Sequence, residues 1–163
     1  MKHFDFFRLF ADNAGVPAKN NPRKRSRTCR IEELESRELL DAGTFAAIKD
    51  LHADLNLGEY EDYNYIEIQL TGVQTDDGAA IRKAITDAGN TAGHDIIVVH
   101  TTTANNGIVL QQNSLEINTA SGDVIIVGYG EANLTLDGNK IRRVFDISAG
   151  TTVGLAGIII TNV

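Results

Sequence analysis

The sequence predicts a mainly β protein in which short strands follow one capping helix. Apolar runs of three or four residues, rich in Ile and Val, recur from residue 96 onward. Gly, Asn, Asp, Ser and Thr separate these runs, which is the pattern of strands joined by tight turns. A length of 163 residues suits one domain with a terminal segment. We divide the chain into residues 1–43, 44–75 and 76–163.

The N-terminal segment, residues 1–43, is predicted to be disordered apart from a short helix at 31–41. Residues 1–30 carry a net charge of +6, whereas residues 31–163 carry −13. A basic N-terminal segment before an acidic remainder is typical of a targeting or interaction tail. Phosphate binding needs a basic surface, so we expect no nucleic-acid partner for the acidic body. No apolar run approaches the roughly 20 residues of a membrane-spanning helix.

The predicted helix at 31–41 carries a motif, Leu34-Glu35-Ser36-Arg37-Glu38-Leu39-Leu40. It resembles the L-E-x-R-x-L-L motif at the start of large exported proteins of planctomycete-type bacteria, which follows a basic stretch. Ser36 stands where that family usually has Pro or an acidic residue. The resemblance implies a bacterial protein that is exported to the cell surface or the extracellular space, and it implies no activity.

The connecting region, residues 44–75, is predicted to hold a helix followed by a strand. Apolar residues at near-helical spacing predict a helix over residues 44–57, and alternation predicts a half-buried strand over 66–73. Three acidic residues between them could be Ca²⁺ ligands: Glu59, Glu61 and Asp62. Because no calcium-loop pattern surrounds them, we interpret this stretch as a solvated acidic loop and expect no cofactor.

The capping helix is predicted over residues 77–88. Ile81, Ala84, Ile85 and Ala88 follow the i, i+3, i+4, i+7 spacing of one helical face. We expect Asp76 or Asp77 to cap its start and Gly89 to end it.

Eight strands are predicted after this helix, and two architectures fit them: an antiparallel sandwich or barrel, and a parallel β-helix. The near-regular spacing, the repeated turn residues and the continuous apolar strands favour the β-helix. The strands are expected at residues 96–99, 108–110, 115–117, 124–127, 134–136, 144–147, 152–155 and 158–160.

Residues 77–161 also resemble the opening of a bacterial family of extracellular right-handed parallel β-helix proteins, which is related to polymorphic outer-membrane proteins and repetitive surface adhesins. The resemblance implies a right-handed parallel β-helix behind an N-terminal capping helix. Gly78-Ala79-Ala80 replaces the family's Cys-Ser before the helix. The matching segments, in order, are residues 80–88, 95–98, 107–110, 126–130, 134–138, 143–147 and 157–162.

Members of that family continue for many more coils. We therefore expect this chain to be a truncated product or a fragment, or its open C-terminal coil to be completed by another chain through end-to-end or edge association.

We expect a structural or adhesive role, with surface glycans or other cell-surface proteins as partners. The alternative is a polysaccharide lyase or glycoside hydrolase fragment, and a nucleic-acid-binding tail at residues 19–30 is a third hypothesis. We nominate no catalytic or metal-binding residue, because His94 and His100 lie too far apart along a strand to share a metal and Cys29 has no ordered His near it. The charged residues weighed for an enzyme are Asp123, Asp137, Lys140, Arg142, Arg143 and Asp146. Of these, we expect carbohydrate contact from Asp137, Arg142 and Arg143.

Overall fold

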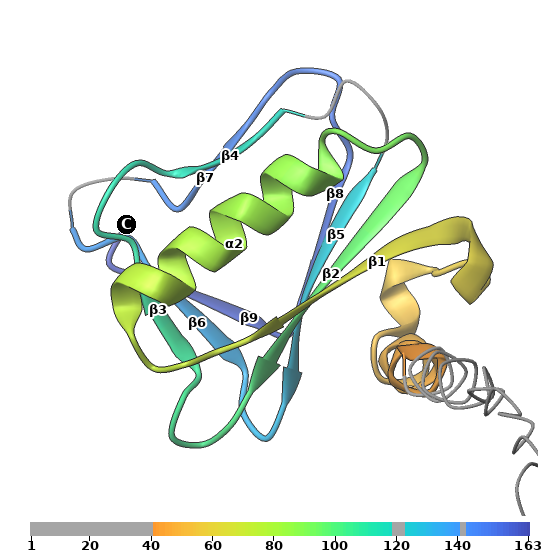
Figure 1. Cartoon of the computed structure of the whole chain (residues 1–163), viewed down its shortest axis with the longest axis horizontal. Helices are drawn as coiled ribbons and strands as arrows, with labels where there is room; N and C mark the ends of the chain where they lie inside the picture. Colours follow the sequence, from red (N-terminus) through yellow and green to blue (C-terminus); the bar gives the residue numbers. More distant parts are fainter. Residues whose placement is uncertain (1–40, 119–122, 141–142) are drawn as a thin grey trace, which may run out of the picture. The chain divides into compact units, whose positions relative to one another are not determined.

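The computed structural model describes residues 41–118, 123–140 and 143–163 (Figure 1). The basic segment and most of the helix predicted at 31–41 therefore lie outside the described residues. Residues 41–51 are helical. The elements that follow are η2 Ala53–Leu55, η3 Tyr60–Asp62, β1 Tyr63–Gln69, α2 Gln74–Ala88, β2 His94–Thr101, β3 Gly107–Val109, β4 Leu115–Ile117, β5 Val124–Gly130, β6 Leu134–Asp137, β7 Phe145–Ile147, β8 Val153–Ala156 and β9 Ile158–Thr161.

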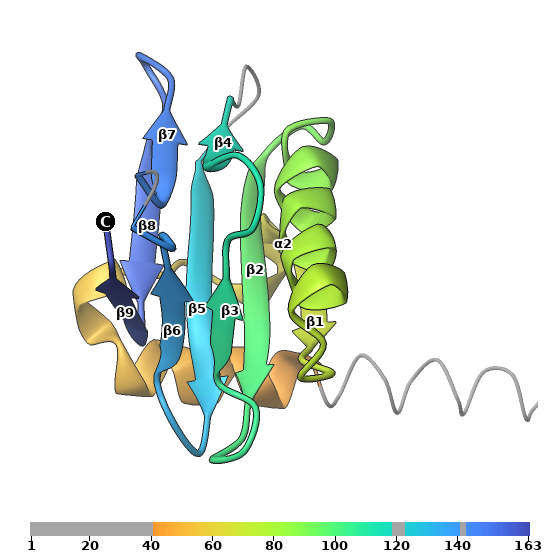
Figure 2. The ribbon, with the colours of Figure 1, turned by 90° about the vertical axis from the view of Figure 1, so that its left-hand side faces the viewer.

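The strands form three sheets, which we call A, B and C. Sheet A has the order β1-β2-β5-β8, sheet B the order β3-β6-β9, and sheet C contains β4 and β7. All six strand pairs in the described part of the chain are parallel. From β2 onward, successive strands therefore enter sheets A, B and C in turn and then begin again. We call each passage of the chain through the three sheets a layer, and Figure 2 shows the strands of successive layers side by side.

These pairings confirm a mainly β fold and exclude the antiparallel sandwich. All eight strands predicted beyond α2 are present, with ends that shift by three residues or fewer. From β3 onward, each of these strands lies in a different sheet from the strand before it, because a turn separates the two. Hydrogen bonding is instead satisfied by the strand one layer further along.

The main core lies between the three sheets and α2. Inward-facing residues at matching register positions are fully buried, such as Ile97 with Ile126 in sheet A and Ile108 with Leu136 in sheet B. Glycine is required at position 128, where β5 lies very close to the turn between β8 and β9. A Cβ on Gly128 would lie 2.4 Å from the carbonyl oxygen of Gly157, inside van der Waals contact.

A second core covers the outer face of sheet A. Ile96 and Val98 of β2 point away from the main core and pack in one cluster with Phe45 and Ile48 of the helix at 41–51. This double burial explains why residues 96–99 form an unbroken apolar run. The helix predicted at 44–57 thus exists over 41–51, and its apolar face serves as a cover for the sheet.

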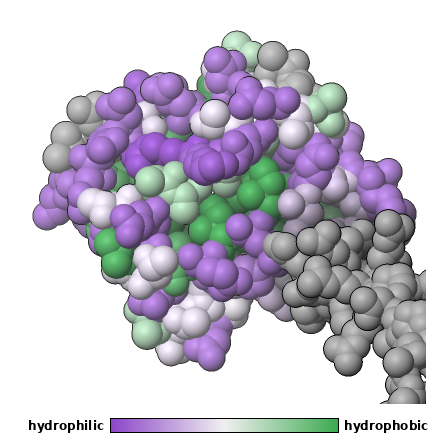
Figure 3. Space-filling model, in the orientation of Figure 1, coloured by the Kyte–Doolittle hydropathy of each residue, from purple (hydrophilic) through white to green (hydrophobic). Residues whose placement is uncertain are grey.

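Helix α2 lies against β1, β3 and β4, the first strands of sheets A, B and C, and against β2, the second strand of sheet A. Its apolar face, Ile81, Ala84, Ile85 and Ala88, is buried in the main core as predicted. Its outer face is hydrophilic, while hydrophobic surface remains visible between α2 and β1 (Figure 3).

The start of α2 corrects the prediction. The N-cap residue is Val73, without a side-chain cap, and the helix begins at Gln74. Asp77 does not cap this helix: its carboxylate accepts hydrogen bonds from the backbone N–H groups of Thr71 (2.8 Å) and Gly72 (3.0 Å). The C-cap is Gly89, as expected.

The second core, on the outer face of sheet A, also predicts how the stability of the fold changes with pH. Burial, followed by the nearby charge of Glu67, raises the pKa of the Tyr65 hydroxyl well above its usual value of about 10. The folded state therefore holds this proton while the unfolded chain loses it, so stability should fall as the pH rises above about 10.

We expect Tyr65→Phe to make the free energy of unfolding less steeply dependent on pH in this alkaline range. Urea unfolding at a series of alkaline pH values measures the slope. Equal slopes for the variant and the wild type would contradict the assignment.

Candidate functional site

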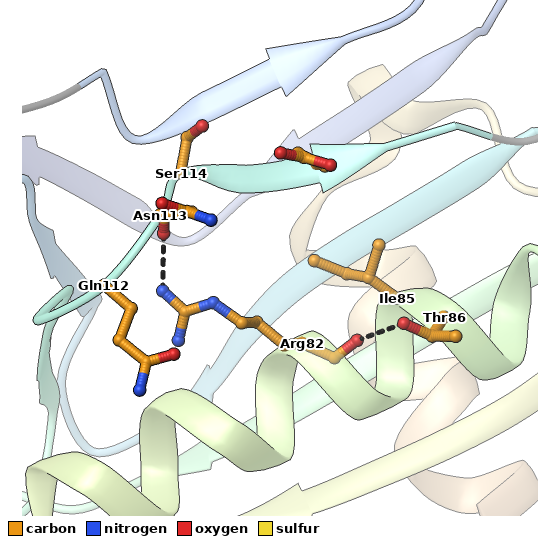
Figure 4. Close-up of a pocket in the computed structure, with 7 residues that line it drawn as sticks. Arg82, Ile85, Thr86, Gln112, Asn113 and Ser114 are labelled. Carbon is orange, nitrogen blue, oxygen red and sulfur yellow. Dashed lines mark hydrogen bonds between the residues drawn. The ribbon is translucent and has the colours of Figure 1, made fainter.

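A polar groove runs between α2 and the segment that joins β3 to β4. It consists of two adjoining cavities of about 220 and 260 Å³, and Arg82 and Gln112 line both. The smaller one is shown in Figure 4. The remaining lining residues of that cavity are Ile85, Thr86, Asn113, Ser114 and Glu116. Those of the larger one are Gln74, Thr75, Gly78, Ala79, Val109 and Gln111.

Arg82 bridges the groove between its two walls. Its Nη1 donates a hydrogen bond to the carbonyl oxygen of Gly78, one turn back in α2, at 2.9 Å. Its Nη2 donates to the carbonyl oxygen of Asn113 at 2.5 Å, which places the guanidinium across the gap (Figure 4). A guanidinium has five N–H donors, so three remain for a ligand or for water.

Gln74 closes one end of the groove and completes the backbone hydrogen bonding of β3. Its side-chain Nε2 donates to the carbonyl oxygen of Gly107 at 3.0 Å, and its Oε1 accepts from the N–H of Val109 at 2.5 Å. An amide side chain here takes the place of a neighbouring strand. The anchor for this arrangement is Asp77, which is 1% exposed and holds the turn before α2.

The groove can form hydrogen bonds, and its lining holds a single carboxylate. Its lining contains amides, hydroxyls, one cation (Arg82) and one carboxylate (Glu116). Hydrolysis of a glycosidic bond uses two carboxylates about 5–10 Å apart. The groove is therefore suited to holding a small polar group.

The residues nominated for carbohydrate contact do not meet in this groove. Asp137 lies at the end of β6, where its Oδ1 accepts from the N–H of Asn139 at 2.7 Å and its Oδ2 accepts from Nδ2 of Asn162 at 2.7 Å. Arg143 is exposed and forms an ion pair with Asp146 at 3.5 Å. Arg142 lies outside the described residues. Asp137 thus organises a turn.

The histidines of β2 are held apart, each beside a different carboxylate. Nδ1 of His94 lies 3.4 Å from Oδ2 of Asp123, and Nε2 of His100 lies 3.0 Å from Oε1 of Glu67. No group of three or more His, Cys, Asp or Glu side chains that could hold a metal ion occurs among the described residues.

The acidic stretch before β1 has local structural partners. Asp62 accepts a hydrogen bond from the N–H of Glu59 at 3.1 Å, which caps the turn of η3. Glu59 also pairs with Lys49 at 3.3 Å. Two of the three carboxylates considered for Ca²⁺ are therefore engaged within the chain.

From the sequence, no residue that lines the groove was nominated, and the groove itself was not identified. The available signal was the polar run Gln111-Gln112-Asn113-Ser114 between two strands, together with Gln74 and Arg82 eight residues apart on one helix. Such a pattern shows that these side chains are polar, but not which helix or strand they face.

The chain matches no protein-family model, and searches of the curated proteins and of the solved structures found no match. In the described ranges, no helix is long and apolar enough to cross a membrane.

The bridge across the groove predicts a local effect of mutation. Arg82→Gln removes the hydrogen bond to Asn113, and we expect a loss of about 1.5–3 kcal/mol in the free energy of unfolding, the range for a hydrogen bond that involves a charged group. Hydrogen exchange should also accelerate at the backbone N–H groups of residues 111–115.

The matched control is Lys83→Gln, one position along α2. Lys83 is exposed and pairs with Asp87, four residues along the same helix, so its loss should cost less than about 0.5 kcal/mol. Equal effects of the two substitutions would contradict the bridging role of Arg82.

Proposed function

We propose that residues 76–163 form the capped beginning of a right-handed parallel β-helix. The proposal rests on the repeated passage of the chain through sheets A, B and C, with parallel pairing between the strands of each sheet. A solenoid requires each layer to pair only with its neighbours, and a terminal cap protects its open end. The position of α2 over the first strands supports this cap.

The proposal extends to a structural or adhesive role on an exported protein, with surface glycans or cell-surface proteins as partners. The N-terminal motif at residues 34–40 supports export to the cell surface or extracellular space. The groove beside α2 supports binding without catalysis, because it supplies amide and hydroxyl groups around one arginine. A carbohydrate-active enzyme fragment remains the second candidate; its support is the family resemblance together with the exposed Arg143 near β7.

The solenoid proposal can be tested by disulfide trapping in sheet C, the wall that completes each turn. Glu116 and Asp146 are exposed register partners on β4 and β7. Neighbouring strands are about 4.8 Å apart, within the span of a disulfide. In a Cys29→Ser background, Glu116→Cys with Asp146→Cys should therefore crosslink on mild oxidation and raise the unfolding temperature.

The control pair is Glu116→Cys with Ser148→Cys, which is displaced by two residues along the strand and so falls outside disulfide reach, at about 8 Å. Efficient crosslinking of this pair, or failure of the first, would overturn the stacked arrangement.

The adhesive role predicts reversible glycan binding without turnover. We expect the purified chain to bind polygalacturonate in titration calorimetry and to release no unsaturated sugar product. Arg143→Gln should weaken binding by up to about fivefold, because an exposed ion pair is worth about 0.2–1 kcal/mol.

Lys83→Gln, which removes an exposed cation on α2, is the control and should bind as the wild type does. Formation of unsaturated product would favour the lyase alternative. Absence of binding to both acidic and neutral glycans would remove glycans as partners.

A further inference from the structure

The end of the turn between β5 and β6 carries an acceptor pattern for N-glycosylation, Asn133-Leu134-Thr135. Attachment of an oligosaccharide to asparagine requires Ser or Thr two positions later, with any residue except Pro between them. No other asparagine in this sequence is followed by Ser or Thr at that spacing. Glu131 lies two positions before Asn133, so the segment also has the acidic residue that bacterial oligosaccharyltransferases recognise there.

The structure places Asn133 at the surface with its side chain unengaged. Asn133 is exposed and lies directly before β6. Its carbonyl oxygen accepts a hydrogen bond from Nδ2 of Asn106 at 3.4 Å, whereas its side-chain amide has no hydrogen-bond partner among the described residues. This turn lies beside the turn between β2 and β3, at one end of sheets A and B (Figures 1 and 2). The amide that would receive a glycan is therefore free and faces solvent.

The side chain of Thr135 also faces away from the core. Strand β6 alternates, because Leu134 and Leu136 are fully buried while Thr135 and Asp137 are partly exposed. In the described part of the chain, the Thr135 hydroxyl forms no hydrogen bond. A β-branched apolar residue would fit this strand equally well. The hydroxyl is thus not needed for packing and is available for recognition.

Glu131 is exposed on the same turn and holds it to the neighbouring one. Its Oε2 accepts hydrogen bonds from the backbone N–H of Thr103 at 3.1 Å and from the Thr103 hydroxyl at 3.3 Å. These bonds lie at the surface, where water can take the place of either partner. They fix the turn while leaving Asn133 in solvent.

We propose that Asn133 is N-glycosylated after the chain has left the cytoplasm. The inference rests on the exported location in the proposed function, but on neither the adhesive role nor the groove beside α2. In the transfer, Nδ2 of Asn133 forms a bond to the anomeric carbon of an oligosaccharide carried on a polyprenyl pyrophosphate. The bond from that carbon to the pyrophosphate oxygen breaks, the lipid pyrophosphate leaves with the bonding electrons, and Nδ2 gives up one proton.

The buried Leu134 determines when this transfer occurs. A transferase has to reach Asn133 and Thr135 together, and Leu134 between them is 0% exposed in the folded chain. Transfer therefore precedes the packing of β6 against its neighbours. After folding, the glycan extends into solvent from the end of a turn, a position at which a bulky polar group is tolerated.

The test is the mass of the full chain after export, behind a cleavable secretory signal, into the periplasm of a bacterium that carries an oligosaccharyltransferase and its lipid-linked oligosaccharide. We expect a form that is heavier by one oligosaccharide, with the added mass on the peptide that contains Asn133. Asn133→Gln, Thr135→Val and Glu131→Gln should each lose the added mass. Thr135→Ser should keep it, because serine retains the hydroxyl.

Asn90→Gln is the matched control. Asn90 is an exposed asparagine in the turn after α2, but Ala92 stands two positions later, so this variant should be glycosylated as the wild type is. Circular dichroism verifies that each variant is folded. The glycosylated chain should unfold at the same temperature as the unmodified chain, because the glycan does not contact the core.

An exported wild-type chain that stays unmodified would overturn the glycosylation site. The added mass in a folded Asn133→Gln or Thr135→Val variant would place the glycan elsewhere and would also overturn it, as would a glycosylated chain that cannot fold. Since the secretory signal is supplied, none of these outcomes bears on export. The exported location fails separately, if the chain without the added signal stays inside the cells that produce it.

Discussion

The structure depends on parallel, in-register pairing between strands of successive layers. From β2 onward, successive strands enter different sheets, so that none of these strands pairs with the next strand in sequence. Ile97 pairs with Ile126, and Ile126 with Leu155, so that side chains of similar size repeat at the same core position. A shift of one residue would turn each of these apolar side chains to the opposite face. The register thereby determines both the main core and the surface.

Repetition alone leaves the first layer of strands without a neighbouring layer on one side. At the start, a helix, an amide side chain and a guanidinium replace the missing neighbour. Gln74 binds the backbone of β3, while Arg82 binds the carbonyl oxygen before β4. The groove lies between α2 and the segment that joins β3 to β4, and its lining includes the Gln74 and Arg82 side chains that make these hydrogen bonds.

Local sequence patterns predicted the strands and helices, but not which segments pack over them. The Ile–Val runs with turn residues between them identified eight strands, and the i, i+3, i+4, i+7 stripe identified α2. The continuous run at 96–99 correctly indicated burial on both faces, but it did not show that Phe45 and Ile48 form the outer cover. Asp77 resembled a helix cap, yet its carboxylate binds the preceding turn because burial brings Thr71 and Gly72 to it.

By itself the sequence determined where strands and helices occur, because alternation, helical spacing and turn residues act over only a few neighbouring positions. It also determined the uncharged character of residues 147–163. The tertiary structure alone decided which strands pair, which face of sheet A receives the helix at 41–51, and where the groove forms. The partners of Gln74 lie 33 and 35 residues away along the chain. Contacts over such separations depend on how the layers stack, and no local pattern encodes them.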